Sequence, residues 1–179
     1  MIGIVDAPIK GLKIIKIPSF CDSRGSFTKV FNTLAFSEAG LLTNFVESYY
    51  SISAKNVIRG MHFQIPPAEH TKLVHVNTGK ITDVVLDIRR HSKTFGEYFK
   101  IEVTGKDNIL IYIPVGCAHG FLSMENDTMV TYMQTSVYNS ELDQGIKNDS
   151  FGYKWDVDKP IVSVRDMEFQ KFSPNLEYF

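Results

Sequence analysis

The sequence predicts an all-β protein, built as a β-sandwich or β-barrel. Three observations support this fold class. Short runs rich in β-branched and aromatic residues recur along the chain at regular spacing. Turn-forming glycine, proline and aspartate residues separate these runs. Clear helical features are confined to Leu34–Gly40, which ends on a glycine, so we expect one or two short helices at the periphery.

The predicted strands can be justified in chain order. Pro18 ends the first strand, and the turn-like segment Asp22–Gly25 precedes the second. Thr78 and Gly79 form a turn that leads into the next apolar run. The predicted strands are Leu12–Ile17, Phe27–Phe31, Phe45–Ser53, Val57–Phe63, Lys72–Val76, Lys80–Ile88, Tyr98–Val103, Ile109–Ile113, His119–Ser123 and Thr128–Thr135. We expect the polar and aromatic tail from Asp156 onward to pack on the body of the molecule.

Alternation within two of these strands puts charged side chains on otherwise apolar faces. Asp83 and Asp87 share a face of Lys80–Ile88, so that face meets either solvent or a polar cavity. We expect structural rather than catalytic roles for these two carboxylates. Lys72 shares a face with Val74 and Val76. Such a lysine commonly reaches out to water, but inside a barrel mouth its ammonium would be available to a reacting oxygen.

The composition is that of a globular protein, and we expect residues 1–179 to form a single domain. A formal net charge of −1 gives no sign of a nucleic-acid-binding or membrane-binding surface. The N-terminal residues lack the features of a secretory signal, and the two cysteines, Cys21 and Cys117, do not make a disulfide framework. These features predict a cytoplasmic protein.

The segment Arg59–Gln64 concentrates groups that could perform chemistry. The Arg59 guanidinium can hold a diphosphate with two parallel hydrogen bonds, and the His62 imidazole can exchange a proton near neutral pH. Gly60 lets the backbone bend or lets another group come close. The plainer interpretation is a strand with one surface arginine and one hydrogen-bonded histidine.

Other kinds of site are poorly supported by the sequence. Gln64 stands two residues after His62, so the His-x-His pair of many metal-binding barrels is absent and we expect no metal. No serine occupies a sharp nucleophile turn, and no glycine-rich loop could cradle phosphates. His119 follows a proline–glycine turn at the start of a strand, where functional sites gather in barrels.

Several motifs then follow one another in a specific order. They are Asp22–Phe27, Arg59–Pro67, Lys72–Val74, Asp83–Arg89, Ser92–Gly96, Ile113–Phe121, Tyr132, Tyr138 and Ser163–Asp166. Together they resemble the dTDP-4-dehydrorhamnose 3,5-epimerase family over nearly the whole chain. The resemblance implies a cupin-type jelly roll, a homodimer, and no metal or other cofactor. It also implies epimerisation at C3, C5 or both of a nucleoside-diphosphate 4-keto-6-deoxy sugar.

The resemblance assigns roles in this reaction. A ketone at C4 acidifies the hydrogens on C3 and C5, so a proton can leave one face of the ring and return on the other. By resemblance, His62 is the base, Asp166 is its carboxylate partner, and Tyr132 is the acid on the opposite face. Lys72 would stabilise the enolate oxygen, and His119 would lie near the same carbonyl.

The resemblance also implies a set of substrate-binding residues. Arg24 and Arg59 would hold the diphosphate, and Phe20 and Tyr138 would stack near the nucleotide. Gln64, in the Arg59–Pro67 motif, is also predicted to bind substrate.

The chain departs from the family at several positions. Lys29 stands where the family usually has glutamate, and Glu47 and Tyr49 replace a usual glutamine and asparagine. His70 also replaces a usual glutamine. We predict that Lys29 and Glu47 help to select the substrate, unless they are an exposed pair with no role. The departures leave open which nucleotide is bound, how many centres are inverted, and which sugar is the final product.

One part of this arrangement conflicts with a regular strand. Arg59 and His62 are three residues apart, so regular alternation would put them on opposite faces. Both can reach one cavity only if the backbone bulges or regular pairing ends between them, which Gly60 would permit.

Two other functions stay open at this stage. One is a nucleotide-sugar 3,4-ketoisomerase on the same scaffold, although enzymes of that kind generally lack the Arg-Gly-x-His block. The other is a sugar-nucleotide-binding barrel without turnover, which would bind its ligand without exchanging the hydrogens of the sugar.

Overall fold

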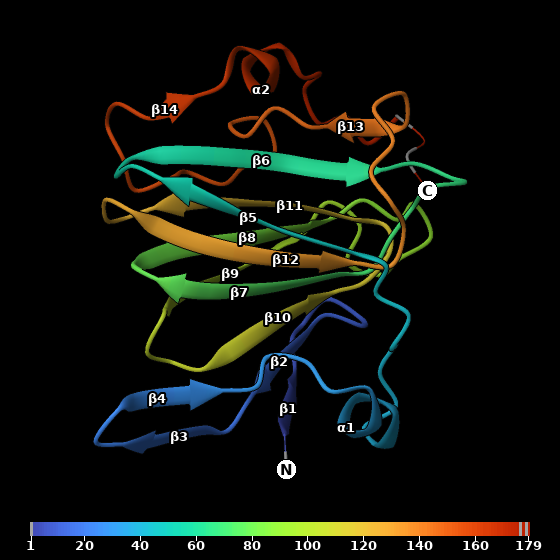
Figure 1. Ribbon diagram of the computed structural model, residues 1–179. Coiled ribbons are helices and arrows are strands. Elements are labelled where there is room, and N and C mark those ends of the chain that lie inside the picture. Colours follow the sequence, from blue (N-terminus) through green and yellow to red (C-terminus); the bar gives the residue numbers. More distant parts are fainter. Residues whose placement is uncertain (1, 176, 178) are drawn as a thin grey trace.

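Two antiparallel sheets pack face to face in the computed structural model, which describes residues 2–175, 177 and 179 (Figure 1). The first sheet has the order β1 (Gly3–Asp6), β2 (Lys13–Lys16), β10 (Ile109–Ile113), β7 (Lys72–Thr78), β12 (Thr128–Gln134) and β5 (Glu47–Ser53). The second has the order β13 (Asp143–Gly145), β6 (Val57–Gln64), β11 (Cys117–Ser123), β8 (Lys80–Asp87) and β9 (Tyr98–Thr104). A short strand, β14 (Ile161–Val162), pairs in parallel with β6.

The remaining elements lie outside this sandwich. The strands β3 (Ser19–Asp22) and β4 (Gly25–Thr28) form a separate hairpin, and the two helices, α1 (Thr33–Glu38) and α2 (Val164–Glu168), are short (Figure 1). The prediction of an all-β sandwich with short peripheral helices is therefore confirmed. The prediction that a strand continues to Phe31 is wrong, because β4 ends at Thr28. Among the described residues, no helix has the length and apolar character needed to cross a bilayer.

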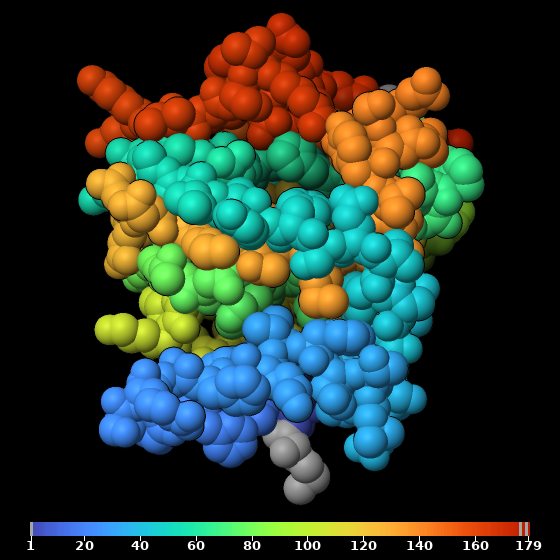
Figure 2. Space-filling model, viewed as in Figure 1, coloured from blue at the N-terminus to red at the C-terminus, as the bar shows by residue number. Residues whose placement is uncertain are grey.

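Three apolar clusters account for the layering. The central cluster fills the space between the sheets, with Val74 and Val130 from the first sheet and Val85 and Phe121 from the second. The outer face of each sheet is covered by one end of the chain. In Figure 2 the C-terminal segment (red) lies over the top of the molecule and the N-terminal segment (blue) lies below it. The tail from residue 156 thus packs on the body, as predicted, and its Phe172, together with the preceding Trp155, packs against the cluster outside the second sheet.

The faces predicted from alternation point into the sandwich. Lys72 shares the inner face of β7 with Val74 and is buried rather than extended into water. Asp83 and Asp87 lie on the inner face of β8 and are also buried. Asp87 has a structural role, because its carboxylate accepts hydrogen bonds from Arg89, Ser92 and Thr94.

An irregularity between β6 and β11 resolves the conflict between Arg59 and His62. His62 pairs with His119 and Arg59 pairs with Phe121, so three residue steps on β6 oppose two on β11. This bulge turns both Arg59 and His62 to the inner side. Gly60 makes the bulge possible because it has no Cβ. A Cβ at this position would lie only 2.5 Å from Gly120 Cα, and the φ of +125° is one that glycine adopts readily.

Gly60→Ala tests how much the fold depends on this close approach. Gly25→Ala is a matched control, because its φ is +120° but a Cβ there would meet nothing within 4 Å. We expect the control to cost about 1–2 kcal/mol of backbone strain, and Gly60→Ala to cost about 1–3 kcal/mol more because β6 and β11 must separate. Urea unfolding of both variants measures the difference. Equal losses of unfolding free energy in the two variants would show that the close approach of Gly60 to Gly120 does not constrain the fold.

Candidate active site

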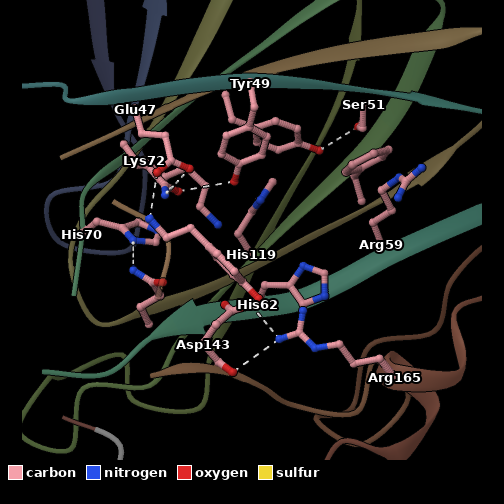
Figure 3. A pocket seen from close by; sticks show the side chains of 15 residues that line it. Glu47, Tyr49, Ser51, Arg59, His62, His70, Lys72, His119, Asp143 and Arg165 are labelled. Carbon is pink, nitrogen blue, oxygen red and sulfur yellow. Dashed lines mark hydrogen bonds and ion pairs between the residues drawn. The ribbon is translucent and has the colours of Figure 1, made fainter. Parts of the chain in front are cut away.

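A cavity of about 510 Å³ lies between the two sheets, within the range of small-molecule sites. Strands of both sheets contribute to its walls (Figure 3). Its lining is rich in titratable side chains and consists of Glu47, Tyr49, Ser51, Arg59, His62, Gln64, His70, Lys72, His119, Phe121, Tyr132, Gln134, Tyr138, Asp143 and Arg165.

His62 is held by a carboxylate from the C-terminal segment. Its Nε2 lies 2.9 Å from Asp166 Oδ1, and the second carboxylate oxygen accepts the Gly60 N–H at 3.0 Å. Ser163 caps α2 and accepts the Asp166 N–H, which fixes the position of that residue. Since a carboxylate only accepts hydrogen bonds, Nε2 carries the proton and Nδ1 of the neutral ring is free to take one up.

The charged state of Asp166 is favoured by the same contacts. Burial alone would raise the pKa of its carboxyl group, but hydrogen bonds from His62, Gly60 and Ser163 outweigh burial and hold the pKa below its usual value. An ionised Asp166 can stabilise an imidazolium when His62 takes up a proton. The Phe169 ring packs edge-on against His62, with ring centroids 5.6 Å apart.

A second histidine–aspartate pair lies beside the first. His119, directly opposite His62 in the strand register, has its Nε2 2.7 Å from Asp83 Oδ2. Both side chains are buried, and burial lowers the pKa of His119 in spite of the neighbouring carboxylate. The neutral ring therefore presents an unprotonated Nδ1, which can accept a hydrogen bond from a hydroxyl group or an ammonium.

Lys72 supplies a cation with an unusual pKa. Burial lowers the pKa of its ammonium to about 8, although Asp143 and Asp83 favour the charged form. The neighbouring His70 stays neutral because burial, helped by the charge of Lys72, lowers its pKa to about 3. His70 Nδ1 lies 3.3 Å from Gln64 Nε2, which can only donate. At neutral pH the lysine is thus mostly charged and the histidine is not.

Tyr132 enters the cavity from the sheet that faces His62. Its hydroxyl lies 3.3 Å from Ser51 Oγ, and its ring stacks on Tyr49. Burial raises the pKa of the Tyr132 phenol, so the group keeps its proton. A proton acceptor and a proton donor therefore reach one cavity from opposite walls, His62 from β6 and Tyr132 from β12.

The cavity also carries a set of polar groups around this pair. Arg59 donates to Ser53 Oγ at 3.0 Å and to the Ile52 carbonyl at 3.2 Å, which fixes its guanidinium at the cavity wall. Glu47 accepts the Tyr138 N–H at 2.8 Å. Arg165 forms a 2.6 Å ion pair with Asp143 that Figure 3 shows across the cavity from Glu47.

Most residues predicted from the sequence to form a site come together here. Those lining the cavity are His62, Tyr132, Lys72, Arg59, His119, Tyr138, Glu47 and Gln64, while Asp166 lies directly behind His62. Phe20, Arg24 and Lys29 do not line it. Phe20 and Arg24 lie on the exposed β3–β4 hairpin, and Lys29 follows that hairpin on the surface. Within the single chain these three residues therefore have no contact with the cavity.

Sequence reasoning missed several lining residues, among them Ser51, Gln134, Asp143 and Arg165. Alternation could have found Gln134, which shares a strand face with Tyr132, whereas the short strand that carries Asp143 gave no periodic signal. Within the described part of the chain, histidine, cysteine, aspartate and glutamate side chains do not form a group of three or more that could hold a metal ion.

Comparisons with known proteins agree on one family. A sequence profile described as dTDP-4-dehydrorhamnose 3,5-epimerase matches residues 6–174. The enzyme of that name from Methanothermobacter thermautotrophicus is 35% identical over 179 residues, which cover 97% of this chain and 96% of the relative.

Two solved structures extend the likeness to the fold. The epimerase from Bacillus anthracis, with TDP and PPi bound, is 30% identical with a TM-score of 0.92 and covers 96% of this chain and 100% of its own. The dTDP-6-deoxy-D-glucose-3,5-epimerase from Legionella pneumophila, in complex with dTDP-4-keto-L-rhamnose, is 30% identical with a TM-score of 0.90, covering 96% and 93% of the two chains.

Proposed function

This chain belongs to the dTDP-4-dehydrorhamnose 3,5-epimerase family, and we propose that its cavity epimerises a nucleoside-diphosphate 4-keto-6-deoxy sugar at C3, C5 or both. The protein is an isomerase, and its fold is the cupin-type jelly roll of the family. The observation that carries the proposal is the pair of groups facing each other in the cavity. An imidazole backed by a carboxylate and a protonated phenol reach the same space from facing sheets.

The reaction follows from these groups. Nδ1 of His62 removes the proton next to the C4 ketone, and Asp166 stabilises the imidazolium that forms. The electron pair of the broken C–H bond moves to the C4 oxygen, where the Lys72 ammonium stabilises the enolate. Tyr132 then donates its proton to the same carbon from the other face, so the centre is inverted. Solvent returns a proton to Tyr132 and removes one from His62.

The proposed nucleotide is inferred from the relatives. One relative binds TDP and another a dTDP-keto-sugar, which supports a thymidine nucleotide here. Arg59 is the cation suited to the diphosphate. Glu47 departs from the family, and its carboxylate already accepts from Tyr138 N and Gln134 Nε2, so it would shape the wall rather than bind phosphate.

The exposed hairpin supports a homodimer as part of the proposal. Phe20 and Phe27 are 65% and 63% exposed, and Arg24 projects into solvent beside Asp22. Two exposed aromatic rings and an arginine on one hairpin suit a surface that a second copy covers. In such a dimer, Phe20, Arg24 and Lys29 would reach the cavity of the other copy.

Solvent exchange is the first test of the proposed reaction. A panel of nucleoside-diphosphate 4-keto-6-deoxy sugars in deuterated water should gain deuterium at C3, C5 or both, as seen by NMR. His62→Ala should abolish the exchange, because the base is gone. Movement of the carbonyl from C4 to C3 would indicate the ketoisomerase instead, and tight binding without exchange would indicate a binding protein.

The titration of Lys72 predicts a pH dependence. Because only the ammonium stabilises the enolate, kcat/KM should fall as pH rises through about 8, the pKa of that group. Lys72→Gln should lower the rate about 10²–10³-fold and remove this alkaline limb. An unchanged limb in Lys72→Gln would assign the titration to another residue.

Mixing two inactive variants tests the dimer and the hairpin together. If Arg24 serves the other copy, a heterodimer of Arg24→Ala and His62→Ala has one intact site, and an equal mixture should recover about a quarter of the wild-type rate. If Arg24 serves its own chain, no site is intact and the mixture stays inactive. Sedimentation of the wild-type protein as a monomer would contradict the dimer directly.

A further inference from the structure

Tyr132 is held on three sides by residues to which the proposed reaction gives no role, and one of these contacts is a stacked aromatic ring. The hydroxyl lies 3.3 Å from Ser51 Oγ, and the ring edge meets His119 with centroids 6.3 Å apart. The third contact is the face of the Tyr49 ring, stacked on Tyr132 at a centroid distance of 4.9 Å and an interplanar angle of 20°. Figure 3 shows Tyr49 among the cavity-lining side chains.

The strand register puts Tyr49 in this place. Tyr49 on β5 is the direct cross-strand partner of Tyr132 on β12, and side chains of such pairs lie side by side on one face of the sheet. Its own hydroxyl donates to Gln134 Oε1 at 3.3 Å, and Gln134 is buried. Burial raises the pKa of Tyr49 to about 12, so it retains the proton that it donates. Backbone pairing and this hydrogen bond therefore fix the Tyr49 ring from both ends.

The stack adds to the packing of a group that is already buried. The Tyr132 side chain is 6% exposed, with Ser51 at its hydroxyl, His119 at one edge and the Tyr49 ring against one face. Offset or parallel aromatic pairs favour one arrangement over others by about two- to tenfold in population.

We infer that Tyr49 is a positioning residue, which holds the Tyr132 phenol toward the reacting carbon and so favours inversion over return of the proton to the face it left. The inference rests on the proposed function. It concerns the second half of the reaction, in which the enolate can be protonated by Tyr132 from one side or by the His62 imidazolium from the other. A phenol held in place competes better with the imidazolium for protonation of the enolate carbon.

The ratio of inversion to exchange measures this competition. In deuterated water, NMR gives both the rate at which hydrogen is exchanged at the reacting carbon and the rate at which its configuration changes. Tyr49→Leu should lower the ratio about two- to tenfold while exchange through His62 persists. Tyr49→Phe keeps the stack and should stay within about twofold of wild type. Tyr98→Leu is a matched control, because Tyr98 lies on β9 of the other sheet and its ring packs on Tyr153. This variant should leave the ratio unchanged.

The outcomes separate this inference from the proposed function. Absence of exchange in the wild-type protein would overturn both. A wild-type protein that inverts, with an unchanged ratio in Tyr49→Leu, would overturn the inference alone, as would a Tyr49→Phe variant that falls as far as Tyr49→Leu. Thermal unfolding identifies a variant that fails to fold. If Tyr49→Leu does so, Tyr49→Val, which also removes the ring, is measured against the same expectation.

Discussion

The carboxylate of Asp166 ties the end of the chain to the strand that carries the proposed base. One oxygen contacts His62 and the other accepts the N–H of Gly60, the residue that allows β6 to bulge. The same contacts therefore dock α2, stabilise the bulge and orient the imidazole. Without the bulge, Arg59 and His62 would point to opposite faces of β6, and the cavity would lose one of them. The site and the C-terminal layer of the fold thus depend on one buried side chain.

Burial sets the protonation states that the chemistry requires. In water a lysine is fully charged and a histidine is partly charged at neutral pH. Inside this cavity the pKa of Lys72 falls to about 8 and that of His70 falls to about 3, while the phenol of Tyr132 is held more firmly in its protonated form. The ammonium of Lys72, the neutral imidazoles of His70 and His119 and an undissociated phenol therefore coexist within one small space. This is the set of charges that suits proton removal, stabilisation of an enolate, and proton return.

The sequence predicted the parts of the molecule that follow from local periodicity. Alternation in β7 and β8 assigned Lys72 and Asp83 to faces that turn inward, and the three-residue spacing of Arg59 and His62 predicted an irregularity at Gly60. Alternation could not decide between solvent and interior for these charges, because that depends on the facing sheet. The ion pair of Asp143 with Arg165 was also out of reach, since neither residue lies on a periodic segment. The link between Asp166 and His62 spans 104 positions and came only from family resemblance.

The proposed chemistry requires a keto-sugar ring to lie between an imidazole and a phenol contributed by facing sheets. A crystal structure with a nucleoside-diphosphate 6-deoxy sugar bound would test this arrangement. We expect C3 or C5 to lie within contact distance of His62 on one face of the ring and of Tyr132 on the other, with the C4 oxygen near Lys72. A sugar with both side chains on the same face, or one bound outside the cavity, would contradict it.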